Sequence, residues 1–77
     1  MKIKFDGIEF ECESLRKMVQ NKNVFAVIDG ISSSQLNKDG ILQIIENGEV
    51  IEELNSTLVG HEVDYIAKKT FLTFQYN

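Results

Sequence analysis

Two dipeptides that favour tight turns, each with apolar stretches on both sides, constrain what this chain can fold into. The first is Asp6-Gly7 and the second is Asn47-Gly48. Both favour type I′ turns, because such turns need positive φ at both central residues and Asn, Asp and Gly tolerate that conformation best. We therefore predict two β-hairpins in a chain of 77 residues that forms one domain, residues 1–77, built largely of antiparallel strands.

The first hairpin has a register that its own charges support. With Asp6-Gly7 as the turn, Lys4 lies opposite Glu9, and the same register places Lys2 opposite Glu11. Such opposite-charge pairs across strands contribute roughly 0.2–1 kcal/mol each. The other face of the hairpin is apolar and consists of Ile3, Phe5, Ile8, Phe10 and Cys12. A slip of one residue would place lysine opposite phenylalanine, so we expect this register and a buried apolar face.

Two further stretches predict strands. Residues 24–28 form a continuous apolar run rich in β-branched and aromatic side chains, so we expect a central strand buried on both faces. Residues 70–76 predict a strand at the C-terminal end, because aromatic and β-branched residues dominate it. Its side chains alternate, which places Leu72, Phe74 and Tyr76 on one face.

The second hairpin has an alternative. As a hairpin, it places Ile45 opposite Val50 and Ile44 opposite Ile51. As a helix over residues 41–58, its isoleucines and leucines would roughly follow helical spacing and the domain would be α+β. We favour the hairpin, because a glycine inside the helix would cost about 1 kcal/mol.

The remaining segments predict connections. We expect a loop or strand edge over residues 31–36, a turn at residues 37–40 and a bend at residues 58–61, where small and polar residues gather. One short helix could form over residues 15–20 or residues 63–69. The sequence therefore predicts a mostly-β fold, either a small barrel or an antiparallel sheet of hairpins packed on itself.

Composition excludes several classes of partner. The net charge of −4 disfavours nucleic acid, because binding to phosphates needs clustered lysine and arginine. Lys68-Lys69 before Phe71 is more simply a core strand preceded by solvated lysines. No stretch approaches the ~20 apolar residues that a membrane-spanning helix needs, and the N-terminal residues do not resemble a signal peptide. With Cys12 as the single cysteine, we expect a cytoplasmic protein without a membrane partner.

Residues 35–46 partly match the calcium loop of an EF-hand. Matching residues at loop positions three, five, six and twelve are Asn37, Asp39, Gly40 and Glu46. Position one is Gln35, which cannot supply the charged ligand expected there. We therefore predict a polar turn rather than a calcium site, and keep calcium binding as the weaker alternative.

Neither the single histidine nor the single cysteine predicts catalysis. A transition-metal site normally draws on several His or Cys ligands, whereas His61 and Cys12 are far apart in the sequence. Cys12 also falls on the apolar face of the first hairpin, where cysteine usually acts as a small hydrophobic side chain. The glycines are scattered singly and form no phosphate-binding loop. We expect no enzyme activity, no metal centre and no cofactor.

An acidic cluster around the second hairpin carries the functional prediction. It consists of Glu46, Glu49, Glu52 and Glu53. We predict a non-enzymatic protein-interaction or assembly module that meets a protein partner or a second copy of the chain through this cluster or a sheet edge. A composition rich in Ile, Lys, Asn and Glu, without Pro or Trp, resembles that of small open reading frames from AT-rich bacteria or their phages, so a phage or prophage accessory protein is one form of this prediction. The alternatives are a ligand- or metal-binding protein that uses the loop at 35–46, and an acidic inhibitor that mimics nucleic-acid charge.

Overall fold

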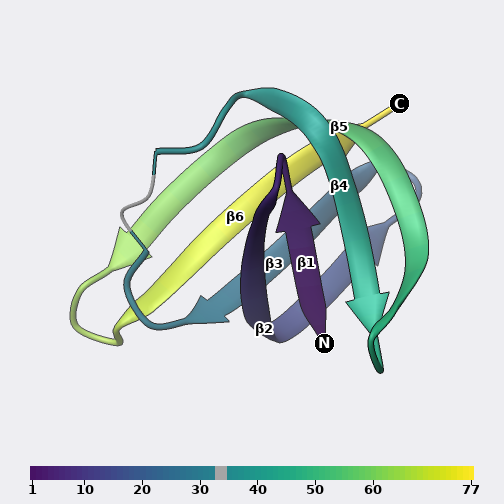
Figure 1. The fold of residues 1–77 in the computed structure, drawn as a ribbon. Coiled ribbons are helices and arrows are strands. Elements are labelled where there is room, and N and C mark those ends of the chain that lie inside the picture. The colour runs from purple at the N-terminus through teal and green to yellow at the C-terminus, as the bar shows by residue number, and fades with distance from the viewer. Residues whose placement is uncertain (33–34) are drawn as a thin grey trace.

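The chain forms a closed antiparallel β-barrel in the computed structural model, which describes residues 1–32 and 35–77 (Figure 1). Its strands are β1 (Lys2–Phe5), β2 (Ile8–Met18), β3 (Asn23–Asp29), β4 (Asp39–Glu46), β5 (Glu49–Asp64) and β6 (Lys69–Tyr76). None of the described residues forms a helix. The prediction of a mostly-β fold is confirmed, and of its two architectures the structure has the barrel. The alternative helix over 41–58 and the short helices over 15–20 and 63–69 are wrong.

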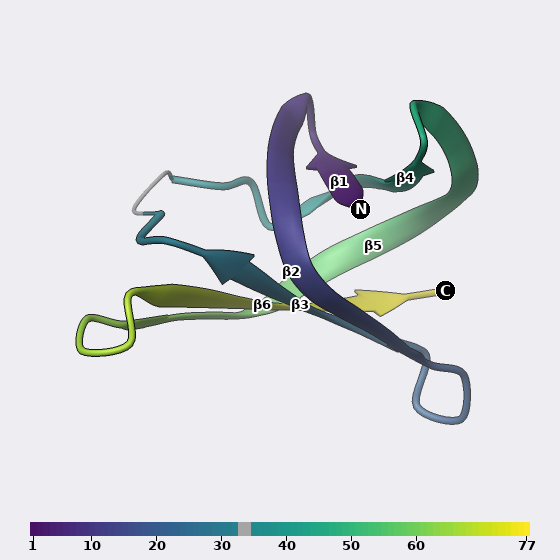
Figure 2. The same cartoon turned by 90° about the horizontal axis from the view of Figure 1, so that it is seen from below.

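The barrel consists of two three-stranded meanders, β1-β2-β3 and β4-β5-β6. The meanders join where β3 pairs with β6 and where β1 pairs with β4, so the order around the barrel is β1-β2-β3-β6-β5-β4. The long strands β2 and β5 bend sharply and take part in both sides of the barrel, as Figure 2 shows. Shifts of register accompany these bends, between Cys12 and Ser14 in β2 and between Leu58 and Gly60 in β5. An extra residue on one strand increases bending in this way.

The Asp6-Gly7 hairpin has the predicted register. Lys4 pairs with Glu9 and Phe5 with Ile8, and the turn residues have φ of 50° and 84°. Both values lie in the left-handed region that a type I′ turn requires. The apolar face of the hairpin turns into the barrel, which confirms the assignment of inside and outside.

The Asn47-Gly48 hairpin is also confirmed, but its register differs from the prediction beyond the first two pairs. Ile45 pairs with Val50 as expected, whereas Ile44 pairs with Glu52. A bulge on β5 leaves Ile51 without a partner residue on β4, and its side chain is 54% exposed. The bulge therefore moves Glu52 to the inner side of the strand, a change that the apolar pattern alone could not predict.

The core fills the barrel with side chains from both meanders. Its buried apolar residues are Ile3, Phe5, Phe10, Cys12, Val24, Ala26, Ile28, Leu42, Ile44, Leu72 and Phe74. Thr70, at the start of β6, is also fully buried, and its hydroxyl donates to the carbonyl of Gly30 at 2.8 Å. The outer face of the sheet carries most of the charged side chains.

The expectation that residues 24–28 are buried on both faces is wrong. Val24, Ala26 and Ile28 point into the barrel, whereas Phe25 and Val27 lie on the outer face and are half-buried. A barrel wall has one inner and one outer face, and here no second layer covers the outside of β3. The run is apolar on both faces because its outer side chains pack against neighbours on the adjacent strands.

The predicted connections are partly confirmed. Ser33 and Ser34, within the expected loop at residues 31–36, lie outside the described residues. The expected turn at 37–40 is shorter, because β4 already begins at Asp39. Residues 58–61 form a bulge within a continuous strand instead of a bend, and the β5–β6 connection is a tight turn over residues 65–68.

Candidate functional site

The outer face of the β4–β5 hairpin carries exposed β-branched side chains. Ile41 is 51% exposed, Val50 is 48% exposed, and Ile51 is exposed to a similar degree at the bulge. Ile45 lies opposite Val50 and is half-buried. We call Ile45, Val50 and Ile51, with the carboxylates of Glu46, Glu49 and Glu53, the hairpin patch. Glu53 shares the outer face with Val50, whereas Glu46 and Glu49 are the next pair after Ile45 and Val50 and extend from the other side of the strands at the exposed turn. Exposed apolar side chains with carboxylates beside them can offer both burial and charge to a partner.

The structure places the four predicted glutamates in two different environments. Glu46 and Glu49 face each other across the turn and are exposed. Glu53 is exposed farther along β5, where its Oε2 accepts a hydrogen bond of 2.5 Å from Nε2 of Gln43. The bulge at Ile51 places Glu52 opposite the inward-facing Ile44, on the other side of β5 from Glu53.

Glu52 belongs to an interaction across the barrel opening. Its carboxylate accepts a hydrogen bond from the ammonium of Lys17, on β2, which is not a neighbour of β5 in the sheet. The same ammonium lies 5.3 Å from the ring centroid of Tyr76. The hydrogen bond to Glu52 is the main cause that raises the pKa of Lys17. Glu52 is thus paired with Lys17 at the barrel opening, and the other three glutamates are exposed.

A second surface, which the sequence analysis missed, lies on the outer face of β3, β6 and β5. The rings of Phe25 and Phe71 stack there, with 6.1 Å between their centroids and 14° between their planes. Beside them, an open cleft of about 280 Å³ is lined by Phe25, Gly60, Glu62, Phe71 and Thr73. We call this the aromatic cleft. The alternation of side chains along residues 24–28 and 70–76 is the signal that could have placed both rings outside, once β3 and β6 are paired.

The span 35–46 is not arranged as a calcium loop. Asp39 and Glu46 are the first and last residues of strand β4, so they are separated by up to roughly 23 Å at 3.3 Å per residue and do not converge on one point. Asn37 donates a side-chain hydrogen bond to Asp6, and Asp39 accepts one of 2.8 Å from Thr57. Within residues 1–32 and 35–77, no three His, Cys, Asp or Glu side chains come close enough to hold a metal ion.

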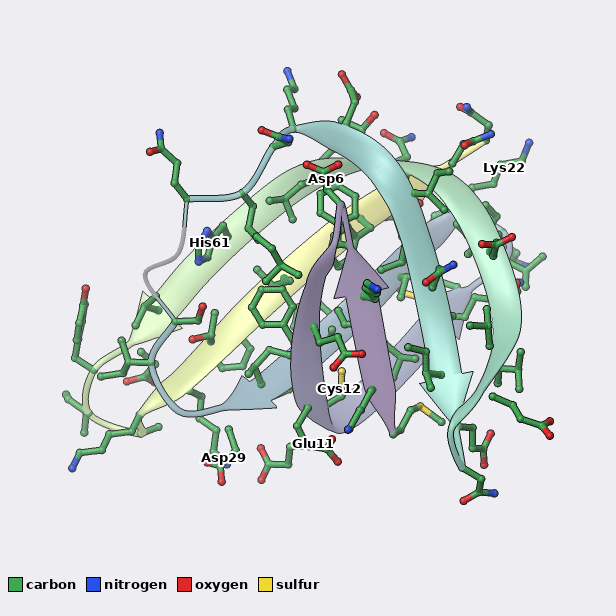
Figure 3. The ribbon with its side chains drawn as sticks, viewed as in Figure 1. Asp6, Glu11, Cys12, Lys22, Asp29 and His61 are labelled. Carbon is green, nitrogen blue, oxygen red and sulfur yellow. The ribbon has the colours of Figure 1, made fainter. Side chains whose placement is uncertain are left out.

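Cys12 and His61 are well separated, as Figure 3 shows. Cys12 is 8% exposed, and burial is the main cause that raises the pKa of its thiol to about 11. A thiol with a raised pKa is a poor nucleophile at neutral pH. His61 lies on β5, and its Nε2 is 3.1 Å from the carbonyl oxygen of Ser32. The two side chains therefore do not form a nucleophile–base pair.

The wider comparisons add no relative. Searches against family models, curated proteins and solved structures find no significant match to this chain. Within the described residues there is no helix with the length and hydropathy that a membrane crossing needs. The case for a function therefore depends on the two surfaces described above.

Proposed function

We propose that this protein is a non-enzymatic interaction module that binds a basic protein partner through the hairpin patch. The observation that supports the proposal is the combination of exposed Val50 and Ile51 with three exposed carboxylates, those of Glu46, Glu49 and Glu53, on one strand pair. The apolar side chains and the carboxylates of the patch contribute to binding in different ways. The apolar side chains supply burial on contact, and the carboxylates attract and orient a cationic surface.

The apolar part is small, so the interface it supports is of moderate size. Val50 and Ile51 are each about half exposed, and covering the remaining surface would contribute roughly 1 kcal/mol for each side chain. Neighbouring Ile45 and Ile41 extend the contact along β4. A partner that covered all four would bury apolar side chains on both sides of the Gln43–Glu53 pair, which lies between Ile41 and Ile45 on the same face.

The carboxylates at the turn favour a partner of opposite charge. Glu46 and Glu49 lie directly opposite each other, an arrangement that opposes pairing of the strands. A lysine or arginine from a partner would relieve this repulsion. The net charge of −4 acts in the same direction over a longer range, since exposed charges interact over about 10 Å at 0.1 M salt.

The experiment compares partner capture by matched variants of the full chain. The first variant is Val50→Ser/Ile51→Ser and the second is Glu46→Gln/Glu49→Gln/Glu53→Gln. The control is Asp29→Asn on β3, which pairs with neither strand of the second hairpin. Proteins that the wild type and the control retain from lysate of the native host, but that both patch variants lose, are then purified. Their affinity for the wild type and for each variant is measured by titration calorimetry.

The proposal predicts a basic partner whose affinity falls in both patch variants and falls as salt rises. Equal affinity for the wild type and the two patch variants would contradict it and would place the contact elsewhere. Sedimentation of the purified chain adds a separate test. If Val50→Ser/Ile51→Ser dissociates a dimer of the wild type, the occupant of the patch is a second copy rather than a basic partner.

A further inference from the structure

The aromatic cleft has a defined shape because three strands carry its lining in register. On the outer face, Phe25 pairs with Thr73 across β3 and β6, and Thr73 pairs with Gly60 on β5. In the next row, Phe71 pairs with Glu62. One side of the cleft is therefore aromatic, the opposite side ends in a carboxylate, and Thr73 and Gly60 form the floor between them. Figure 2 shows β3, β6 and the second half of β5 as one layer.

Gly60 keeps the cleft open. A Cβ atom at this position would lie 3.2 Å from both Cβ and Oγ1 of Thr73, which is closer than ordinary side-chain contact. The φ of Gly60 is not in the left-handed region, so the backbone conformation does not require glycine. A glycine within a strand often marks a close approach by another group. Here the missing side chain leaves room directly above the floor.

The charge around the cleft favours a cation. The outer face of β5 carries Glu62 and Asp64, and the ammonium of Lys69 is occupied by Glu13 at 2.6 Å and by Asp29 at 3.6 Å. Another cation, Arg16, pairs with Phe25 from β2. The carboxylates of Glu13, Asp29, Glu62 and Asp64 thus outnumber the cations Arg16 and Lys69 on the strands that carry the rings and on their neighbours. An anionic group would be repelled, whereas a cation would meet the negative faces of two aromatic rings.

We infer that the aromatic cleft binds the guanidinium group of an arginine side chain presented by a protein partner. A guanidinium is planar, so one face can stack on the ring of Phe71 while its N–H groups donate to the carboxylate of Glu62. An ammonium cannot stack in this way, and a neutral planar group lacks the attraction to Glu62. The cleft lies at the opposite end of β5 from the hairpin patch, so the inference does not depend on the proposed function.

The test follows the aromatic and amide NMR signals of the labelled full chain during titration with short peptides. The probes are Ac-Gly-Arg-Gly-NH2, the same peptide with lysine, the same peptide with citrulline, and free guanidinium chloride. Citrulline keeps the planar shape of arginine and removes its charge. We expect saturable shifts of the Phe25 and Phe71 rings and of the amides of Gly60 and Glu62 with the arginine peptide, at millimolar affinity or tighter.

Variants of the chain separate the contributions of charge and space. Glu62→Gln should weaken binding about two- to fivefold, as expected for loss of one exposed ion pair. Gly60→Ala should abolish the saturable shifts, because its methyl group occupies the cleft. Arg16→Gln should strengthen binding, since it removes a cation that lies opposite Phe25 and forms no ion pair within the described residues. Glu9→Gln, on another face, is the control and should bind like the wild type.

The outcomes decide between the guanidinium and other occupants. Shifts of equal size with citrulline, or unchanged affinity in Glu62→Gln, would overturn the inference. Equal binding of the lysine peptide would show that the planar group is not recognised. Equal binding of free guanidinium would favour a small cation over a side chain of a partner. Because Gly60→Ala could disturb the fold, the amide spectrum of this variant is first compared with that of the wild type at residues away from the cleft. If those signals differ, only the result for Glu62→Gln is used to judge the inference.

Discussion

The rings of Phe5 and Phe74 meet across the interior of the barrel, with 4.9 Å between their centroids and 53° between their planes. Phe5 lies on β1 and Phe74 on β6, and these strands are not neighbours in the sheet. The contact therefore holds the two meanders together through the core rather than through backbone hydrogen bonds. Both side chains are completely buried, so the tilted ring pair adds to the burial of two large apolar groups.

Replacing Phe74 by alanine should lower the free energy of unfolding by about 3–5 kcal/mol, because it removes a buried ring and leaves a cavity. Phe10→Ala should have a similar effect, since Phe10 is 7% exposed. Glu9→Ala is the control and should cost less than about 1 kcal/mol, as loss of an exposed partner of Lys4. Urea denaturation measures all three. Equal midpoints for Phe74→Ala and Glu9→Ala would contradict the assignment of the core.

Replacing Gly48 by alanine should destabilise the protein, although the added methyl group has no steric conflict with the described residues. Its φ is 80°, and no atom lies within 4 Å of a Cβ built at this position. The cost is therefore conformational, and we expect Gly48→Ala to destabilise the domain by about 1 kcal/mol. Asn47→Gly is the matched control, because glycine also accepts the φ of 53° found at that position. A thermal midpoint of Gly48→Ala equal to that of Asn47→Gly would contradict this explanation.

Local signals in the sequence were sufficient to predict the hairpins and the strands that flank them. The Asp6-Gly7 turn and the charge pair of Lys4 with Glu9 agree on one register, and the structure has that register. The pairing of β3 with β6 depends on residues far apart in the chain, and no local pattern specifies it. The closure of the barrel could therefore be predicted only as one of two architectures.

The bulges explain most of what the sequence could not show. One extra residue in β5, at Ile51, reverses the direction of Glu52 and removes it from the acidic cluster. Another shift, next to Gly60, sets which β5 side chains lie beside Phe71 and so creates the aromatic cleft. Bulges arise from the bending that closure of the barrel demands, which is a tertiary effect. The candidate surfaces were thus predictable in part for the hairpin patch and not at all for the cleft.

The thiol of Cys12 should react slowly in the folded protein and make stability depend on pH. Its pKa rises from 9.0 to about 11 in the folded state, chiefly through burial, with a further increase from Glu11 that the N-terminal ammonium opposes. The unfolded chain releases the thiol proton near pH 9, whereas the folded chain retains it until about pH 11. Between these values the unfolded state binds fewer protons, so the free energy of unfolding falls as pH rises.

Two measurements check this expectation for Cys12. Alkylation by iodoacetamide at pH 8 should be much slower in buffer than in denaturant, because the thiolate is the reactive form. The free energy of unfolding, measured from pH 8 to pH 11, should fall more steeply for the wild type than for Cys12→Ala. The variant is needed because Lys17 and Lys69, whose pKa values are raised by hydrogen bonds to glutamates, also lose stabilising charge at high pH. Parallel curves for the two proteins would show that the thiol does not titrate as described.

The acidic turn of the second hairpin should lower the free energy of unfolding while it favours binding to a basic partner. Glu46 and Glu49 are a directly opposed pair of like charges at an exposed turn. Glu49→Gln should therefore raise the free energy of unfolding by less than about 1 kcal/mol, with the gain largest at low salt, where repulsion is least screened. Glu49→Lys should raise it further, because it creates an opposite-charge pair with Glu46.

The same substitutions should weaken binding to the basic partner proposed above, with Glu49→Lys weakening it most. Chemical denaturation at 20 mM and 500 mM salt and calorimetric titration with that partner measure the two effects on one set of proteins. Asp29→Asn is the control, because its carboxylate lies on β3, which pairs with neither strand of the second hairpin. A loss of stability in Glu49→Lys would mean that another group already compensates the two carboxylates. In that case there would be no repulsion between Glu46 and Glu49 for a basic partner to remove. The carboxylates of the hairpin patch would then only interact with solvent.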